Sequence, residues 1–183
     1  MKIYFVRHGA TFSNKLGRIM SRTNDESLSD EGLNEAKKIA EELSSVLEYD
    51  IVLSSPLKRA SETASIFAHL KGLQVLHHEG MLEREFGLLS NKTWEEVEVI
   101  TGGRLNHDIW LKEMEFDLSP YEGETKESVR NRILNFIDHL KANYSNQKPL
   151  VVTHGGVLRT LYALFPNHKP KSFKNVSVHE FEV

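Results

Sequence analysis

The sequence predicts an α/β fold of three layers, in which helices cover both faces of a mainly parallel central sheet. Short apolar runs that suit buried strands alternate along the chain with segments whose apolar residues recur every three or four positions, as in amphipathic helices. At 183 residues, of which 39% are hydrophobic, the chain can form one domain with a proper core. We therefore expect a single domain over residues 1–183.

Five short runs are predicted to be strands, because each is apolar and rich in β-branched, leucine or aromatic residues. Predicted helices separate most of them, so most neighbouring strands should run parallel. The predicted strands are residues 3–6, 51–53, 75–76, 149–153 and 176–183.

The helices are located by their caps and their periodicity. Ser29 before two acidic residues marks a helix start, and the apolar spacing carries that helix to Leu47. Ser55 is expected to cap the next helix, with Pro56 at its first position. Residues 90–122 are predicted to be a helical excursion away from the sheet, over the site. The remaining helices are predicted over residues 94–100, 109–114 and 125–140, and from residue 157.

Composition narrows the possible partners. The net charge of −3 gives no sign of a nucleic-acid partner or of a polybasic membrane partner. There are no cysteines, which removes disulfides, thiolate catalysis and cysteine-bound zinc. The apolar stretch at residues 3–6 is too short for a signal peptide, and no run approaches the roughly 20 residues of a membrane span. We expect a cytoplasmic protein, a monomer or a homodimer, that needs no cofactor.

Two predicted strands end in the same way. The first ends in Arg7-His8-Gly9, and the fourth is followed by His154-Gly155. If these strands are parallel neighbours, His8 and His154 lie side by side at the carboxyl edge of the sheet, where α/β folds bind ligands. A glycine after each polar residue lets the chain turn or approach a ligand closely.

Arg59, in the first turn of the helix after the second strand, adds a cation near this edge. Together with Arg7 and the two histidines it suits a phosphate, because guanidinium groups donate paired hydrogen bonds to its oxygens. Glu83 is repelled by a bound phosphate unless it carries a proton, and a protonated carboxyl can give that proton to a leaving alkoxide. Two alternatives are phosphate binding without reaction, and a surface pair between Glu83 and Arg84.

Four motifs follow one another along the chain. They are Arg7-His8-Gly9, the turn Ser54-Ser55-Pro56 with Arg59, Glu83-Arg84 before Phe86-Gly87, and Thr153-His154-Gly155. In this order they resemble the histidine phosphatase superfamily, which includes cofactor-dependent phosphoglycerate mutases, fructose-2,6-bisphosphatase and α-ribazole phosphatase. The resemblance implies a phosphoglycerate mutase-like fold, made of one histidine phosphatase-type domain.

The resemblance also implies roles for the catalytic residues. His8 matches the nucleophile that becomes phosphorylated, and Glu83 matches the proton donor. Arg7, Arg59 and a protonated His154 match the groups that hold the phosphoryl oxygens. No metal is needed in this scheme, because the arginines supply the positive charge.

Further contacts follow from the same resemblance. Asn14 matches an asparagine that touches the phosphoryl group, and Arg84 and Gly155 are expected to contact substrate. Glu122-Gly123-Glu124-Thr125 resembles a stretch of the smaller phosphatases. Ser21 stands where many members have a glycine, and we assign it no role.

The resulting hypothesis is a metal-independent phosphomonoester hydrolase that acts through a phosphohistidine on a small phosphorylated metabolite. A phosphoglycerate mutase-type transferase is the nearest alternative, but the short chain and the Gly-Glu-Thr stretch favour hydrolysis. A metal-dependent hydrolase would use His8 and His154 with His77 or His78, beside which the two arginines would be unfavourable. A non-catalytic sensor of phosphorylated ligands is the third alternative.

Overall fold

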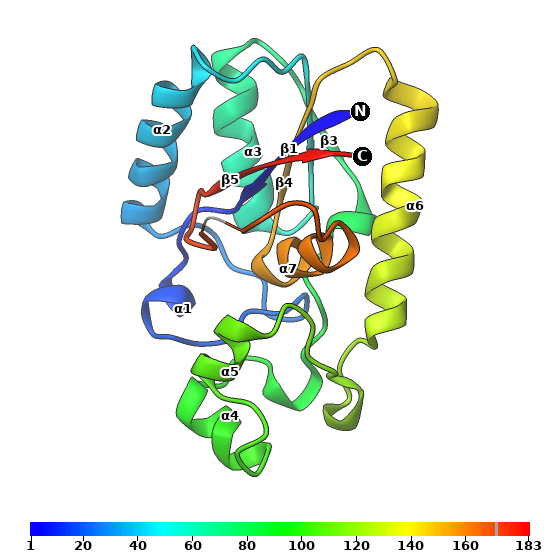
Figure 1. The fold of residues 1–183 in the computed structure, drawn as a ribbon. Helices are drawn as coiled ribbons and strands as arrows, with labels where there is room; N and C mark the ends of the chain where they lie inside the picture. The colour runs from blue at the N-terminus through cyan, green and yellow to red at the C-terminus, as the bar shows by residue number, and fades with distance from the viewer. Residues whose placement is uncertain (171) are drawn as a thin grey trace.

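The computed structural model describes residues 1–170 and 172–183, and its strands form one sheet in the order β3-β2-β4-β1-β5 (Figure 1). The pairs β2–β3, β2–β4 and β1–β4 are parallel, whereas β5 runs antiparallel along β1. The predicted mainly parallel sheet is confirmed. The strands are β1 Lys2–Arg7, β2 Ile51–Ser54, β3 Val75–His77, β4 Pro149–Thr153 and β5 Val178–Glu182.

Helices connect and flank these strands. The α-helices are α1 Phe12–Lys15, α2 Asp30–Ser44, α3 Lys58–Leu70, α4 Trp94–Ile100, α5 His107–Lys112, α6 Lys126–Tyr144 and α7 Gly155–Leu164. Short 3₁₀ helices are η1 Glu79–Met81, η2 Gly87–Leu89 and η3 Ser119–Tyr121. No helix in the described ranges is both long and apolar enough to cross a bilayer.

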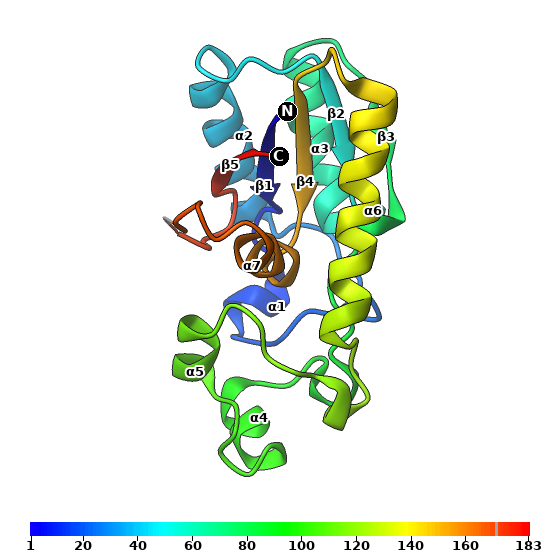
Figure 2. The ribbon, with the colours of Figure 1, turned by 45° about the vertical axis from the view of Figure 1, so that its right-hand side comes forward.

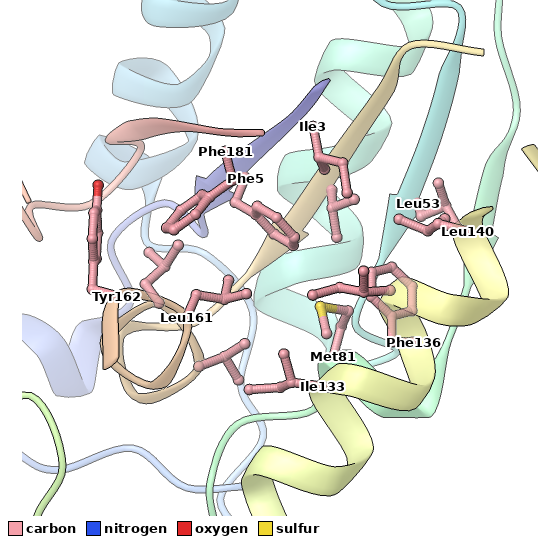
Figure 3. Packing of buried hydrophobic residues seen from close by; sticks show 14 of the residues in the cluster. Ile3, Phe5, Leu53, Met81, Ile133, Phe136, Leu140, Leu161, Tyr162 and Phe181 are labelled. Carbon is pink, nitrogen blue, oxygen red and sulfur yellow. The ribbon is translucent and has the colours of Figure 1, made fainter. Parts of the chain in front are cut away.

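The sheet is buried on both faces, as the alternation along β1 shows. Ile3 and Phe5 pack into one apolar cluster with α6 and α7 (Figure 3), and Tyr4 and Val6 pack into another with α2 and α3. Figure 2 shows α2 and α6 on opposite sides of the strands. The three predicted layers are therefore present.

Several helix boundaries differ from the sequence prediction by a few residues, and two of the differences affect the core or the site. Helix α2 ends at Ser44, although Leu47 beyond it is still buried in the core. Helix α3 begins at Lys58 with Leu57 as its N-cap, so the prediction of Ser55 as the cap was wrong. The hydroxyl of Ser55 instead binds His154, a partner far away in the chain.

Helices α4 and α5 lie beyond the carboxyl ends of the strands, away from the sheet layers (Figures 1 and 2). They pack on an apolar cluster of their own, which we call the third cluster. It includes Trp94, Ile109 and Trp110 as partly buried members. Its buried residues are Ile19, Phe86, Leu89, Val97, Leu105, Leu118 and Tyr121.

Candidate active site

The ends of β1 and β4 bring the two histidines of the strand-end motifs together. Arg7 pairs with Thr153 in the parallel register, and the next backbone N–H, that of His8, donates to Thr153 O at 2.9 Å. The rings of His8 and His154 have centroids 5.1 Å apart. The strand neighbours that the sequence argument required are therefore present.

The side chain of His8 is held in one tautomer. Its Nδ1 lies 2.7 Å from Gly9 O, and a carbonyl can only accept, so Nδ1 carries the hydrogen and the lone pair of a neutral ring is on Nε2. Burial, with the charges of Arg59 and Arg7, holds the pKa of His8 well below 6.5. His8 is thus a neutral imidazole at neutral pH, and within residues 1–170 and 172–183 its Nε2 has no hydrogen-bond partner.

The turn after His8 requires a glycine. A Cβ on Gly9 would lie 3.0 Å from Gly32 O and 3.1 Å from the side chain of Leu28. The Gly9 N–H also donates to Thr63 Oγ1 at 2.9 Å, which ties the turn to α3. The close approach of α2 and α3 therefore fixes the backbone on which His8 stands.

His154 is fully buried and is oriented by Ser55. The Ser55 hydroxyl accepts from Leu57 N–H at 3.4 Å and lies 2.8 Å from His154 Nε2. We assign the hydroxyl proton to this second bond, which places the ring hydrogen of His154 on Nδ1. Burial, Arg59 and His8 hold the pKa of His154 well below its usual 6.5. This shift favours a neutral His154 ring in the free protein, and a neutral ring can still donate from Nδ1.

Arg59 has no exposed surface, and the loop before α2 fixes its guanidinium group. Its Nη2 donates to Ser21 O at 3.0 Å, and its Nη1 lies 3.3 Å from Asn24 O and 3.5 Å from a carboxylate oxygen of Asp25. Burial lowers the pKa of Arg59, and the charges of Glu83 and Asp25 oppose that shift. Ser21 thus contributes its main-chain carbonyl to the site.

Three buried N–H donors around His8 indicate an anion-binding site. Arg7 Nη1 donates to Phe173 O, but Arg7 Nε, Arg59 Nε and His154 Nδ1 are buried without a partner among the described residues. Buried N–H groups are costly unless they meet an acceptor. A phosphoryl group carries several acceptor oxygens and suits these donors.

Glu83 lies in the wall of the same cavity and is 5% exposed. Its Oε1 accepts from Arg84 N–H at 2.8 Å, and its Oε2 accepts from Gly156 N–H at 3.1 Å. A Cβ on Gly156 would lie 2.4 Å from Oε1, so α7 can approach the carboxyl only through a glycine. Two backbone donors thus hold the carboxyl group between η1 and α7.

The cavity has a volume of about 610 Å³, and five of the proposed site residues line it: Arg7, His8, Asn14, Glu83 and Gly155. Arg59 and His154 lie behind this lining with no exposed surface. Arg84 is turned elsewhere, because its Nη2 donates to Phe116 O at 3.1 Å and to Glu124 O at 3.2 Å. Arg84 therefore anchors the returning end of the excursion and does not line the cavity.

The structure adds two residues that sequence reasoning missed. Asn175 Nδ2 donates to His8 O at 2.9 Å and lies 3.4 Å from Asn14 Oδ1. Arg159 is 2% exposed and lines the cavity from α7. The sequence around Asn175 indicates only a loop, and that around Arg159 only an apolar helix. Their contacts arise from the tertiary fold and have no signal in the local sequence.

The histidines of the alternative metal site, His77 and His78, have other neighbours in the structure. His77 Nε2 lies 2.8 Å from Ser61 Oγ, and the ring of His78 lies beside that of His139, tilted, with centroids 5.0 Å apart. Within residues 1–170 and 172–183, no group of three or more histidine or acidic side chains is arranged to hold a metal ion.

Comparison with known proteins agrees with this arrangement. A family model described as histidine phosphatase superfamily (branch 1) matches residues 3–183. Phosphoserine phosphatase 1 of Hydrogenobacter thermophilus is 33% identical over 167 residues, which are 88% of this chain and 74% of that protein. A metal-independent phosphoserine phosphatase of Arabidopsis thaliana is 32% identical over 165 residues, 88% of this chain and 67% of that protein.

A solved structure agrees as well. Bacillus stearothermophilus YhfR superimposes with a TM-score of 0.80 at 26% identity, covering 100% of this chain and 91% of that one. Because the family model spans nearly the whole chain and the relatives above are phosphatases, this protein belongs to the histidine phosphatase superfamily and is a phosphatase.

Proposed function

We propose that the protein is a metal-independent phosphomonoester hydrolase that acts through a phosphohistidine on a small phosphorylated metabolite. The observation that carries this proposal is the hydrogen bond from His8 Nδ1 to Gly9 O at 2.7 Å. It leaves the Nε2 lone pair of a low-pKa imidazole available, near the Nε donors of Arg7, which lines the cavity, and of Arg59, which lies behind the lining, both unpaired among the described residues. That combination suits a nucleophile aimed at phosphorus.

In the first step, His8 Nε2 attacks phosphorus and the bond to the leaving oxygen breaks. Charge on the three other phosphoryl oxygens is stabilised by Arg7, Arg59 and the Nδ1–H of His154. The Glu83 carboxyl gives its proton to the leaving oxygen, so an alcohol departs and Glu83 becomes a carboxylate.

In the second step, water attacks the phosphorus of the phosphohistidine. Glu83 takes a proton from that water, the bond between phosphorus and Nε2 breaks, and phosphate leaves with His8 neutral again. Each group then has the protonation state with which it began.

Arg84 and Asn175 are assigned supporting roles. Arg84 fixes the backbone beside Glu83, and Asn175 holds the main chain of His8. Both contacts support the geometry of the reacting groups without touching the phosphoryl group.

Hydrolysis is supported by two relatives, at 33% and 32% identity, whose names describe phosphoserine phosphatases. Metal independence is supported by the charges of Arg7 and Arg59 near His8 and by the name of the second relative. Arginine charge can stabilise a phosphoryl-transfer transition state as a metal ion does.

The test is to trap the covalent intermediate. Wild-type protein quenched during turnover of a labelled phosphomonoester should carry phosphate that is acid-labile and base-stable, as expected of a phosphoramidate. His8→Ala should carry none and should not turn over. An acid-stable phosphoprotein, or a labelled His8→Ala protein, would show that another residue is the nucleophile.

A further inference from the structure

Part of the cavity lining is aromatic. Phe86, Trp94 and Trp110 all line the cavity. The ring centroid of Trp110 lies 5.6 Å from that of Phe86 and 6.0 Å from that of Trp94. His107 extends the row, 5.3 Å from Trp94. We call these four residues the aromatic wall. The cavity volume of about 610 Å³ lies within the ordinary range for small-molecule sites and leaves ample room beyond one phosphoryl group.

Trp94 and Trp110 are anchored by their helices and by the third cluster. Trp94 opens α4, whose N-cap Thr93 and residue Glu96 form a reciprocal capping box. Trp94 and Trp110 are each half-buried against the third cluster, so part of each ring packs inward and part is left toward the cavity. Both rings therefore have packing partners in the third cluster before any ligand binds.

A cation continues the same surface. The guanidinium carbon of Arg159 lies 5.0 Å from the ring centroid of Trp110 and 4.4 Å from that of Phe173. Burial, with the charge of Arg7, lowers the pKa of Arg159 to about 10. A guanidinium plane can stack on a flat ring as an aromatic side chain does.

We propose that the outer part of the cavity is a binding site for a planar aromatic group, carried on the phosphate ester and stacked against Trp94 and Trp110. This rests on the proposed function only in that the phosphoryl end must lie at His8. Aromatic stacking contributes beyond simple burial, and it should favour an aromatic ester over a saturated ester of equal size by roughly threefold to tenfold in affinity.

The competing explanation is that the tryptophans only anchor α4 and α5. In that case the cavity would accept a flat and a saturated group equally, and a compact polar ester would bind as well as either. The two explanations differ in ligand preference, which can be measured directly.

Benzyl phosphate and cyclohexylmethyl phosphate form a matched pair of probes. They carry the same number of carbon atoms and both leave as alkoxides, so they differ in the flatness of the ring and not in leaving-group chemistry. Binding to His8→Ala is measured by calorimetry and by intrinsic fluorescence. The chain has two tryptophans, Trp94 and Trp110, so tryptophan emission reports on the aromatic wall alone.

Benzyl phosphate is expected to bind roughly threefold to tenfold more tightly than cyclohexylmethyl phosphate and to change the tryptophan emission more. Inorganic phosphate should change it least. Equal affinities, or equal emission changes with both esters, would overturn the proposal. In wild-type protein the same preference should appear in kcat/KM.

Variants of Trp110 test whether this residue is responsible for the preference for the aromatic ester. Trp110→Leu should abolish it, Trp110→Phe should keep most of it, and neither should weaken binding of inorganic phosphate. Phe12→Leu makes the same type of change at a ring that is 64% exposed and outside the cavity lining, and should have no effect. If Trp110→Leu does not fold, the comparison of the two esters on His8→Ala decides alone. Failure to trap a phosphohistidine would refute the proposed mechanism and leave this ligand preference standing.

Discussion

Glu83→Gln tests the proton donor, and the structure sets its two expected effects. Both oxygens of Glu83 accept backbone N–H groups, from Arg84 and from Gly156. A glutamine has one acceptor oxygen, so one of those buried N–H groups must face its NH₂. An unsatisfied buried donor costs about 1–3 kcal/mol, and we expect the free energy of unfolding to fall by that amount.

The second effect is on rate and depends on the leaving group. The benzyl ester would release a strongly basic alkoxide, which needs a proton as it leaves, whereas 4-nitrophenyl phosphate releases the stable anion of an acidic phenol, which does not. Phosphorylation of His8 should therefore slow by roughly 10²–10⁴ with the benzyl ester and much less with the nitrophenyl ester. Because both esters are aromatic, binding to the aromatic wall does not confuse the comparison.

The assay is rapid-mixing kinetics with both esters. With the nitrophenyl ester, Glu83→Gln should give a burst of about one phenol per site and then slow turnover, since the base for water is gone. Glu79→Gln, at an exposed carboxylate in η1, is the matched control and should behave as wild type.

Equal losses with the two esters would refute the role of Glu83. Other nearby carboxylates are poorly placed to replace it. Glu85 Oε1 accepts from the N–H groups of Phe86 and Gly87, both at 3.1 Å. Glu124 is bound by Arg22 and Arg132.

Three further predictions concern charge and pH. Arg59→Ala should lower kcat/KM by roughly 10²–10³, and should move the acid limb of the pH profile upward, because burial and then Arg59 depress the pKa of His8. Prolonged EDTA treatment should leave activity unchanged; loss that zinc or manganese restores would contradict metal independence. Burial and Arg7 lower the pKa of His179 from 6.5 to about 4, so between these pH values only the unfolded chain binds its proton, and stability falls as pH falls. Denaturant titrations of His179→Gln should show a slope smaller by about 1.4 kcal/mol per pH unit in that window; an unchanged slope would rule this out.

The strands, and the carboxyl edge of the sheet where His8 and His154 lie, could be predicted because they depend on local sequence pattern. Apolar runs such as residues 149–153 are long enough to identify as buried strands, and a polar residue followed by glycine marks where each strand leaves the core. The placement of His8 beside His154 required β1 and β4 to be parallel neighbours, and the register of Arg7 with Thr153 meets that condition.

The remaining contacts depend on partners distant in sequence. Ser55 has the residue type of an N-cap, but its hydroxyl binds His154, and nothing in the local sequence distinguishes the two uses. Arg84 stands next to Glu83 in the chain, but carbonyls across the excursion hold its guanidinium group. Arg159 follows an apolar helical pattern and gives no local sign that it faces the cavity.

The third cluster has a consequence for how such an enzyme can diversify. The phosphoryl-binding groups His8 and His154 stand on strands whose packing belongs to the two sheet clusters, whereas Trp94 and Trp110 depend on the third cluster. Substitutions in α4 and α5 can therefore reshape the leaving-group side of the cavity while the sheet keeps its stability. On the proposed mechanism and the proposed aromatic site, reaction and substrate preference would depend on separately packed parts of one chain, and substitutions in residues 94–112 would change the preference while His8 and His154 keep their positions.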